Sequence, residues 1–351
     1  MIRSVMGIGL VINALAITAF GVTGTPTSAH SGHDHSEQEA PAEQIIGPNA
    51  GNPERWIEEW PDTDFLRSIV YFDEISDGPP KDGIPALIDV SFIPAAQETH
   101  VEDPEPVITF VMEGETPRAY PVRYLMWHEI INDTVGGVPV AVTYCPTCNS
   151  GIVFDRRVED RVLIFGVTGK LRNANLIMYD LETLSWWQQA VSIGIVGHYA
   201  GVELRELTAW TESFADFKAR NPQGLVMDEP DLNQAYGNNP YVSYDTGRTS
   251  SFYNGENPPH GIHPLARVVR VGDRAWPFER LVRLGAINEA GVRISWESGQ
   301  ASPLDDPRIA KGRDIGSVRV RDSRDQDIPH DVLFAYAFHA FWPDGTWMLG
   351  D

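Results

Sequence analysis

Short hydrophobic segments separated by turn residues follow one another along the chain from residue 56 onward. Each segment is rich in β-branched or aromatic residues, and Gly, Pro, Asn and Asp stand between the segments. This alternation is typical of strands joined by tight turns. The segments predicted as strands are 107–112, 138–144, 152–154, 162–165, 176–179, 268–271, 292–296, 318–320 and 332–338.

Helical patterns are few. One is predicted over residues 121–131, because a proline at its start fits the first turn of a helix. The other is predicted over residues 214–220, where Ser213 can cap the amino end and Asn221-Pro222 ends the pattern. The sequence therefore predicts an α+β fold that is predominantly β, with many short antiparallel strands and few short helices.

A weak internal similarity suggests two pseudo-repeated halves. Residues 108–125 and 268–281 each contain an apolar strand, a turn glycine, an Arg-Ala-aromatic-Pro sequence and a leucine four residues later. The hypothesis is a duplication whose second copy lies within residues 264–351. Under this hypothesis the first half carries the functional site, because the strand that follows it leads into both cysteines of the chain.

The amino-terminal region has the layout of a secretory signal. A basic residue, Arg3, precedes an apolar run over residues 5–22, and small residues follow up to position 29. We expect residues 1–29 to be a signal peptide and the protein to be exported, periplasmic or extracellular; retention of the segment as a membrane anchor is the alternative. We expect residues 30–52 to form a disordered tail that contains histidines. Residues 53–351 are expected to form a single β-rich domain.

Composition excludes several classes of protein. The chain has 351 residues, of which 42% are hydrophobic and 22% charged, which is close to the globular average. Its formal net charge of −22 would repel a phosphate backbone, so nucleic acid is not an expected partner. No phosphate-binding loop spacing occurs, so no nucleotide cofactor is expected. We expect a small molecule or a metal ion as the ligand.

The most informative segment holds the two cysteines of the chain, Cys145 and Cys148, in a Cys-Pro-Thr-Cys sequence between two predicted strands. Such a pair has three interpretations: a small disulfide loop, a redox-active dithiol, or half of a metal site. Asn149 and Gly151 follow, and they tolerate the left-handed backbone that a tight turn between strands needs. Neither a Gly-x-Ser-x-Gly motif nor a His-Glu-x-x-His motif occurs in the sequence, and the catalytic residues stay unknown.

The leading hypothesis is a soft or borderline metal ion, copper or zinc, held by this turn. Two thiolates on one tight turn commonly supply two of the four ligands of such a site, and imidazoles would supply the others. The histidines proposed as further ligands are His128, which lies closest in sequence, then His260, His263 and His339.

Two alternatives use the same cysteines differently. The first is a periplasmic thiol-disulfide oxidoreductase. The second treats the cysteines as a structural disulfide and predicts a carbohydrate- or peptide-binding module. In that case cations, amides and aromatic rings near a glycine-rich turn would line the ligand cleft. The proposed ligand-binding residues are Thr168, Lys170, Arg172, Asn173, Asn175, Trp186 and Gln188.

Several ordered motifs together resemble one family of secreted prokaryotic proteins, catalogued as domain of unknown function 3179. The motifs are Arg118-Ala119-Tyr120-Pro121, His128-Glu129, Asn132-Asp133, Gly136-Gly137-Val138-Pro139, Tyr144-Cys145-Pro146-Thr147-Cys148, Phe154-Asp155-Arg156, the segment 165–180 and Ser185-Trp186-Trp187-Gln188. The resemblance covers about residues 81–277, with an extension to residue 342 as the alternative. It implies domain limits and emphasises the cysteine motif, but it implies no reaction.

Overall fold

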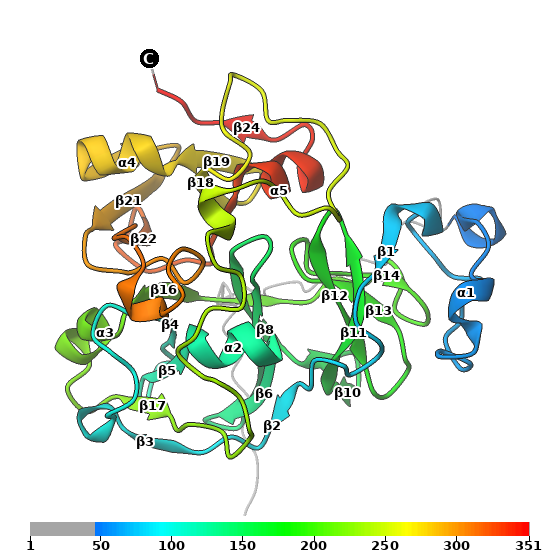
Figure 1. Ribbon diagram of the computed structural model, residues 1–351, viewed down its shortest axis with the longest axis horizontal. Coiled ribbons are helices and arrows are strands. Elements are labelled where there is room, and N and C mark those ends of the chain that lie inside the picture. Colours follow the sequence, from blue (N-terminus) through cyan, green and yellow to red (C-terminus); the bar gives the residue numbers. More distant parts are fainter. Residues whose placement is uncertain (1–45, 351) are drawn as a thin grey trace, which may run out of the picture. The chain divides into compact units, whose positions relative to one another are not determined.

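The computed structural model describes residues 46–350, and the predicted signal peptide and most of the predicted tail lie outside this range. Within it, no helix combines the length and the apolar character that a bilayer crossing needs. The described part is mostly β, with 36% strand and 16% helix, so the predicted predominance of strands is confirmed. Its five larger sheets are arranged as the blades of a five-bladed propeller (Figure 1).

The two cysteines lie in a five-stranded sheet, here called the cysteine sheet. Its strands, in spatial order, are β15 (Glu206–Leu207), β8 (Ser150–Asp155), β7 (Val138–Cys145), β6 (Ile130–Val135) and β2 (Leu87–Ile88). A second five-stranded sheet contacts it through β11 and β6. That sheet consists of β1 (Ile75–Asp77), β11 (Phe165–Arg172), β12 (Asn175–Asp180), β13 (Trp186–Gln188) and β14 (Ile193–Val196).

Three further sheets and a two-stranded ribbon complete the β structure. The third sheet contains β16 (Ala209–Ser213), β4 (Pro106–Phe110), β5 (Arg118–Pro121), β17 (Leu225–Met227) and β3 (Phe92–Pro94). The fourth contains β23 (Asp331–Phe334), β18 (Arg267–Val271), β19 (Arg274–Pro277) and β24 (Thr346–Trp347). The fifth contains β20 (Ala286–Glu289), β21 (Val292–Glu297) and β22 (Ser317–Asp322), and the ribbon pairs β9 (Arg157–Val158) with β10 (Arg161–Val162).

The α-helices of the described residues are short. They are α1 (Glu54–Ile57), α2 (Val122–His128), α3 (Phe214–Arg220), α4 (Phe278–Leu284) and α5 (Ala335–Phe341). The helix predicted over residues 214–220 is confirmed at both ends, and the Ser213 hydroxyl accepts the backbone N–H of Asp216 at 3.1 Å as its cap. The helix predicted over 121–131 is confirmed in part, because it ends at His128.

Two predictions of local structure were wrong. The segment 332–338 is a strand only to Phe334 and then continues as α5. The prediction failed because the segment is almost entirely apolar, and its hydrophobic pattern has neither the period of a strand nor that of a helix. The segment 165–175 is not a glycine-rich loop. It is the long strand β11, with a register irregularity around Gly169, and its tight turn lies at Asn173 and Ala174, which both have positive φ.

The third and fourth sheets share one strand order. In the third, β16 pairs with β4, β4 with β5, and β17 lies parallel to β5. In the fourth, β23, β18, β19 and β24 pair in the same order and directions. Seven-residue helices occupy corresponding positions, α2 and α4 after the second strand of the hairpin, and α3 and α5 before the parallel strand. The common order is compatible with a duplication, which itself stays a prediction.

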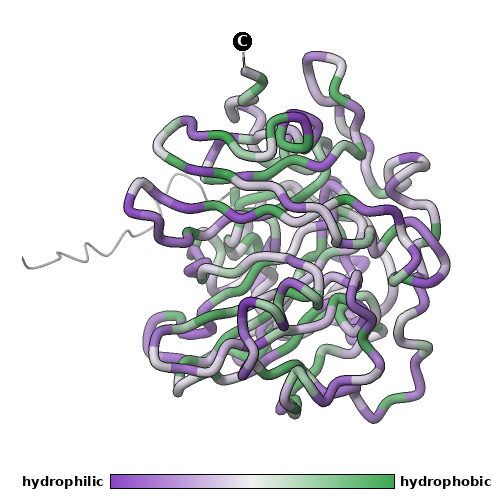
Figure 2. Tube along the Cα trace, turned by 90° about the vertical axis from the view of Figure 1, so that its left-hand side faces the viewer, coloured by the Kyte–Doolittle hydropathy of each residue, from purple (hydrophilic) through white to green (hydrophobic). Residues whose placement is uncertain are grey.

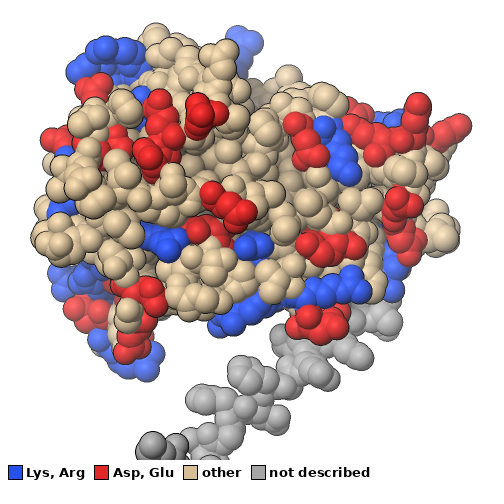
Figure 3. All heavy atoms as spheres, turned by 90° about the horizontal axis from the view of Figure 1, so that it is seen from below, with Lys and Arg blue, Asp and Glu red and all other residues tan. Residues whose placement is uncertain are grey.

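Apolar segments run through the interior strands while polar segments lie mainly in the connections (Figure 2). The largest buried cluster surrounds both cysteines and draws residues from four sheets. A second, aromatic cluster lies between the segment 46–75 and the outer face of β12 to β14. On the surface, acidic and basic side chains are interspersed over the face drawn in Figure 3.

Candidate functional site: a buried dithiol

The cysteine turn, residues 145–150, joins two paired strands, as predicted. Strand β7 ends at Cys145 and β8 begins at Ser150, and these two residues are partners across the ladder. Asn149 has a φ of 56°, so the residue expected to take the left-handed backbone does so. Its side chain also donates to the carbonyl of Val332 in β23 at 3.1 Å. The turn is therefore held by the fourth sheet as well as by its own.

A buried carboxylate anchors the far end of the turn. Asp331 of β23 accepts the hydroxyl of Ser150 at 2.6 Å and the backbone N–H of Gly151 at 3.0 Å. Gln189 donates to the Ser150 hydroxyl at 3.2 Å from the other side. Because these hydrogen bonds come from separate sheets, the position of the cysteine turn depends on how those sheets pack together.

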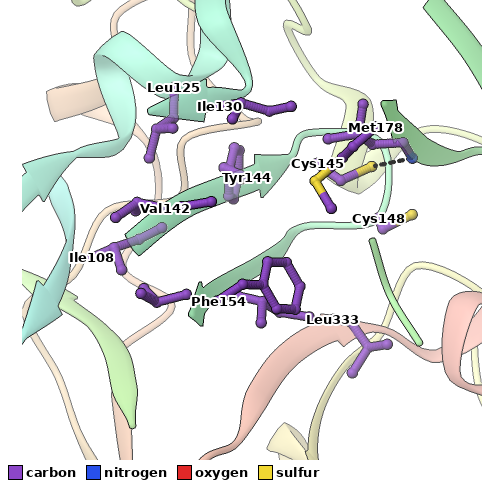
Figure 4. Close-up of a cluster of buried hydrophobic side chains, with 14 of the residues drawn as sticks. Ile108, Leu125, Ile130, Val142, Tyr144, Cys145, Cys148, Phe154, Met178 and Leu333 are labelled. Atoms are coloured by element: carbon purple, nitrogen blue, oxygen red, sulfur yellow. Dashed lines mark hydrogen bonds between the residues drawn. The ribbon is translucent and has the colours of Figure 1, made fainter. Parts of the chain in front are cut away.

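Both cysteines are free thiols and are not at disulfide distance. Cys145 is 1% exposed and Cys148 is fully buried. In Figure 4 their sulfur atoms lie on the turn beyond the ends of β7 and β8, with Met178 beside Cys145 and Leu333 below the turn. The structural disulfide that one of the interpretations predicted is thus not formed in this structure.

The sulfur of Cys145 accepts a backbone donor: the N–H of Leu176 points to it at 3.4 Å, drawn as a dashed line in Figure 4. The hydroxyl of Thr147 lies 3.4 Å from this sulfur but donates to the carbonyl of Ala174 at 2.6 Å, and the Cys145 thiol can donate to the same carbonyl at 3.8 Å. Burial by itself raises the pKa of a thiol, but hydrogen bonding with the Cys148 thiol, with Thr147 and with the N–H groups of Leu176 and Cys148 outweighs it and lowers the pKa of Cys145 to about 7. Cys145 therefore has a large thiolate fraction at neutral pH.

The sulfur of Cys148 is in the opposite situation. It acts as donor, either to the carbonyl of Ala174 at 3.3 Å or to the sulfur of Cys145. Burial and this donated hydrogen bond raise the pKa of Cys148 well above its ordinary value. The hydroxyl of Tyr336, on α5, lies 3.5 Å from the sulfur and donates more closely, at 2.7 Å, to the carbonyl of Thr147. The turn therefore combines one thiolate with one protonated thiol.

Glu129 is bonded through its backbone to the strand that ends at Cys145. It follows α2 directly, is 8% exposed, and its carbonyl accepts the N–H of Tyr144 at 2.8 Å, one residue before Cys145. Burial first, and then the negative charge on Cys145, raise the pKa of Glu129 to about 8. The ionisation of Glu129 is therefore linked to that of Cys145.

A long connection between β17 and β18, residues 228–266, is here called the covering segment. In Figure 1 it passes in front of α2 and β8. Tyrosines of this segment pack on the cluster that contains the cysteines: the rings of Tyr253 and Tyr336 have centroids 4.5 Å apart, and Tyr241 and Tyr244 join the same cluster. Tyrosines of the covering segment therefore form part of the buried surroundings of the two thiols.

The predicted metal ligand His128 is engaged elsewhere. Its Nδ1 donates to the carbonyl of Pro85 at 2.7 Å, and its Nε2 accepts the hydroxyl of Tyr236 at 2.6 Å. Neither nitrogen is left for a metal shared with the cysteines. Among residues 46–350 no group of three or more histidine, cysteine, aspartate or glutamate side chains is arranged to hold a metal ion, so the copper or zinc hypothesis has no support here.

The other proposed histidine ligands are not brought to the cysteines by any contact. His260 and His263 line a separate pocket of about 740 Å³ beside Phe278 and Arg280, and neither cysteine lines that pocket. His339 lies on α5, where its Nδ1 is buried and has no hydrogen-bond partner among the described residues. The four predicted ligands therefore do not form one site.

The residues proposed for a ligand cleft are used internally. Lys170 is buried and pairs with Glu59 at 2.7 Å, and Arg172 pairs with Glu74 at 2.7 Å, so both cations are neutralised within the chain. Trp186 is fully buried in the aromatic cluster. The other proposed residues are also internal or form the β11–β12 turn: Thr168 and Gln188 are buried, Asn173 lies in the turn, and Asn175 donates to Gln189 at 2.8 Å. These contacts give the proposed ligand cleft no support, and it stays a prediction.

The sequence model of one family, described as a protein of unknown function (DUF3179), matches residues 81–345 of this chain. The chain belongs to the DUF3179 family. The match agrees with the longer of the two expected ranges, which ends at residue 342, and it includes β23 and α5, which supply Asp331 and Tyr336. No curated protein and no solved structure matches the chain.

Sequence reasoning missed most residues around the thiols of this DUF3179 chain. In the sequence, Asp331 lies 181 residues after Ser150, and Tyr336 lies 188 residues after Cys148. No local pattern therefore links them to the cysteine motif. Ala174 acts through its backbone carbonyl, which has no residue-type signal. Glu129 could have been noticed in the sequence, because it is a charged residue between a helical pattern and an apolar strand. The corresponding position after α4 is Gly285.

Proposed function

We propose that this protein is a thiol-disulfide oxidoreductase in which Cys145 is the reacting thiolate and Cys148 the second thiol. The observation that carries the proposal is the asymmetry of the pair: both sulfurs are free on one turn, and Cys145 accepts the N–H of Leu176 and has a lowered pKa, whereas burial raises the pKa of Cys148. Disulfide exchange needs this division, because a thiolate attacks first and a protonated thiol is held back for the second step.

The chemistry follows from these roles. The Cys145 thiolate attacks one sulfur of a partner disulfide, the partner's sulfur–sulfur bond breaks, and one partner thiolate leaves. Cys148 then loses its proton and attacks the Cys145 sulfur, which forms the Cys145–Cys148 disulfide and releases the second partner thiolate. Two electrons pass from the dithiol to the partner, and the reverse sequence oxidises a partner dithiol.

Three features support this function over the alternatives. Both cysteines are free on one turn, at the end of a ladder that pairs Cys145 with Ser150. The histidine needed for a metal centre is occupied by Pro85 and Tyr236. Export, which the sequence predicts, would place the protein where disulfide partners occur.

The test is a redox equilibrium. Reduced protein is equilibrated in buffers with graded ratios of reduced to oxidised dithiothreitol and glutathione, quenched, and analysed for the Cys145–Cys148 disulfide by mass spectrometry. We expect a reversible two-electron transition between about −270 and about −120 mV, the range of redox-active pairs. A pair that never forms a disulfide in oxidising buffer, or one that cannot be reduced again without unfolding, would exclude the function.

A further inference from the structure

The second step of the proposed reaction forms a thiolate in the interior of the protein, because Cys148 loses its proton before its sulfur attacks Cys145. Cys148 is fully buried, and a buried thiolate without a hydrogen-bond donor is unfavourable. The carbonyl of Ala174, 3.3 Å from the sulfur, accepts the proton of the thiol but has no hydrogen to offer a thiolate. A donor beside this sulfur would therefore favour the second step.

The hydroxyl of Tyr336 is such a donor. Its oxygen lies 3.5 Å from the sulfur of Cys148 and 2.7 Å from the backbone carbonyl of Thr147, and it makes a hydrogen bond to each. Both acceptors are within reach of the one hydroxyl hydrogen, so the hydrogen can turn from the carbonyl to the sulfur while the ring stays in place. A charged sulfur attracts it more strongly, because hydrogen bonds to ionised groups are stronger than those between neutral groups.

The fold fixes Tyr336 at the cysteine turn. Two residues before it, the backbone N–H of Phe334 donates to the carbonyl of Cys148 at 2.8 Å. The N–H of Tyr336 itself donates to the carbonyl of Pro264 at 2.9 Å. The ring is fully buried and packs against Tyr253, with the centroids 4.5 Å apart. Backbone hydrogen bonds and ring packing together keep the hydroxyl beside the sulfur.

Tyr336 keeps its proton at neutral pH and so remains a donor. The titratable side chains that are electrostatically linked to Cys148 are Cys145 on the same turn, Tyr336 on α5 and Tyr244 on the covering segment. Burial is the largest cause that raises the pKa of each tyrosine above its ordinary value. Neither tyrosine therefore exchanges its own proton with the sulfur.

We propose that Tyr336 stabilises the Cys148 thiolate during the second step of disulfide exchange, by donating its hydroxyl hydrogen to the Cys148 sulfur. This inference rests on the proposed function and adds to it the side chain that assists the second thiol. Its support is geometric: a buried hydroxyl, held by α5, lies within hydrogen-bond distance of a buried sulfur that must become charged.

The step is balanced without any change in the protonation of Tyr336. After the attack by Cys145, a mixed disulfide joins Cys145 to the partner, and the first partner thiolate has left. That thiolate takes the proton of Cys148, and the hydroxyl of Tyr336 turns to the new Cys148 thiolate. The two protein sulfurs then bond, the bond between Cys145 and the partner breaks, and the second partner thiolate leaves. The partner has gained two electrons, and the hydroxyl returns to the carbonyl of Thr147.

Separate rates for the two steps provide the test. Reduced full-length protein is mixed with an equimolar amount of 4,4′-dithiodipyridine, which releases one thiopyridone when Cys145 attacks and another when Cys148 attacks. Loss of a hydrogen bond to a charged group lowers the thiolate fraction roughly 10- to 100-fold, and the higher nucleophilicity of the more basic thiolate offsets about half of this on a logarithmic scale. We therefore expect Tyr336→Phe to slow the second release roughly 3- to 10-fold and to change the first less than about twofold.

The matched control is Tyr253→Phe. It removes a hydroxyl from the ring that packs on Tyr336, but this hydroxyl donates to the carbonyl of Glu256, so neither release should change. The pH profile separates a hydrogen bond to the sulfur from a role in holding the turn. In Tyr336→Phe, the pH at which the second release is half-maximal should rise by about one to two units, because a lost donor raises the pKa of Cys148.

The outcomes distinguish the two proposals. Equal slowing of both releases with an unchanged pH profile, or an unchanged second release, would overturn the role of Tyr336. A wild-type protein that releases no thiopyridone, or only the first, would instead overturn the proposed function.

Discussion

Replacing Trp186 by alanine is expected to lower the free energy of unfolding by about 3–5 kcal/mol, the range for removing a large buried aromatic side chain. Trp186 is fully buried, and its ring centroid lies 5.1 Å from that of Trp56, 5.3 Å from Trp60 and 5.4 Å from Phe65. Its indole N–H has no hydrogen-bond partner among the described residues, so the loss is one of packing. Equilibrium urea denaturation measures it.

The control for this prediction is Leu66→Ala in the same segment. Leu66 is 67% exposed, so its truncation should change the free energy of unfolding by less than about 0.5 kcal/mol. Trp186→Phe should fall between the two variants because it keeps part of the ring contacts. A loss below about 1 kcal/mol for Trp186→Ala would show that the aromatic cluster does not attach the segment 46–75 to the sheet.

Replacing Cys145 by serine is expected to slow alkylation by iodoacetamide at neutral pH by roughly 100-fold or more, since the remaining thiol of Cys148 is held protonated and reactivity follows the thiolate fraction. Cys148→Ser should stay within about tenfold of the wild type, because its hydroxyl can still donate to the Cys145 sulfur. Both thiols are buried, with Cys145 1% exposed and Cys148 fully buried, so limited access affects the two variants alike.

Site-resolved mass spectrometry of the alkylated peptides measures this difference. The roles of the two cysteines would be reversed if Cys148→Ser lost reactivity and Cys145→Ser kept it. Equal rates in both variants would contradict any asymmetry between the thiols. With a disulfide reagent, Cys148→Ser should also accumulate a mixed disulfide on Cys145, because the second thiol is missing.

Local features of this fold were predictable from the sequence. The strands around the cysteine motif either alternate apolar and polar residues or are bounded by turn residues. The predicted segment 138–144 corresponds to β7. The cap at Ser213 and the turn residue Asn149 were also predictable, since each depends on neighbours within four residues. The helix α5 was not, because Ala335–Phe341 is apolar on nearly every side and therefore has no period.

The site was predictable only as far as the two cysteines. Their environment is assembled from four sheets, and its donors and acceptors are backbone groups such as the Leu176 N–H or distant side chains such as Tyr336. The choice between metal and redox chemistry depends on His128, whose two nitrogens are occupied by Pro85 and Tyr236. His128 is close to the cysteines in the sequence, but the sequence could not show which groups its ring nitrogens bind.

The most direct test of the central claim is the ionisation of Cys145. Ultraviolet absorbance of the thiolate is followed from about pH 5 to about pH 10 in reduced protein, with Cys145→Ser as the reference. The account predicts one thiolate that forms around pH 7, well below the value of about 8.5 for an ordinary thiol, and that is missing from the variant. Absence of any thiolate until above pH 8.5, or the same transition in Cys145→Ser, would contradict it.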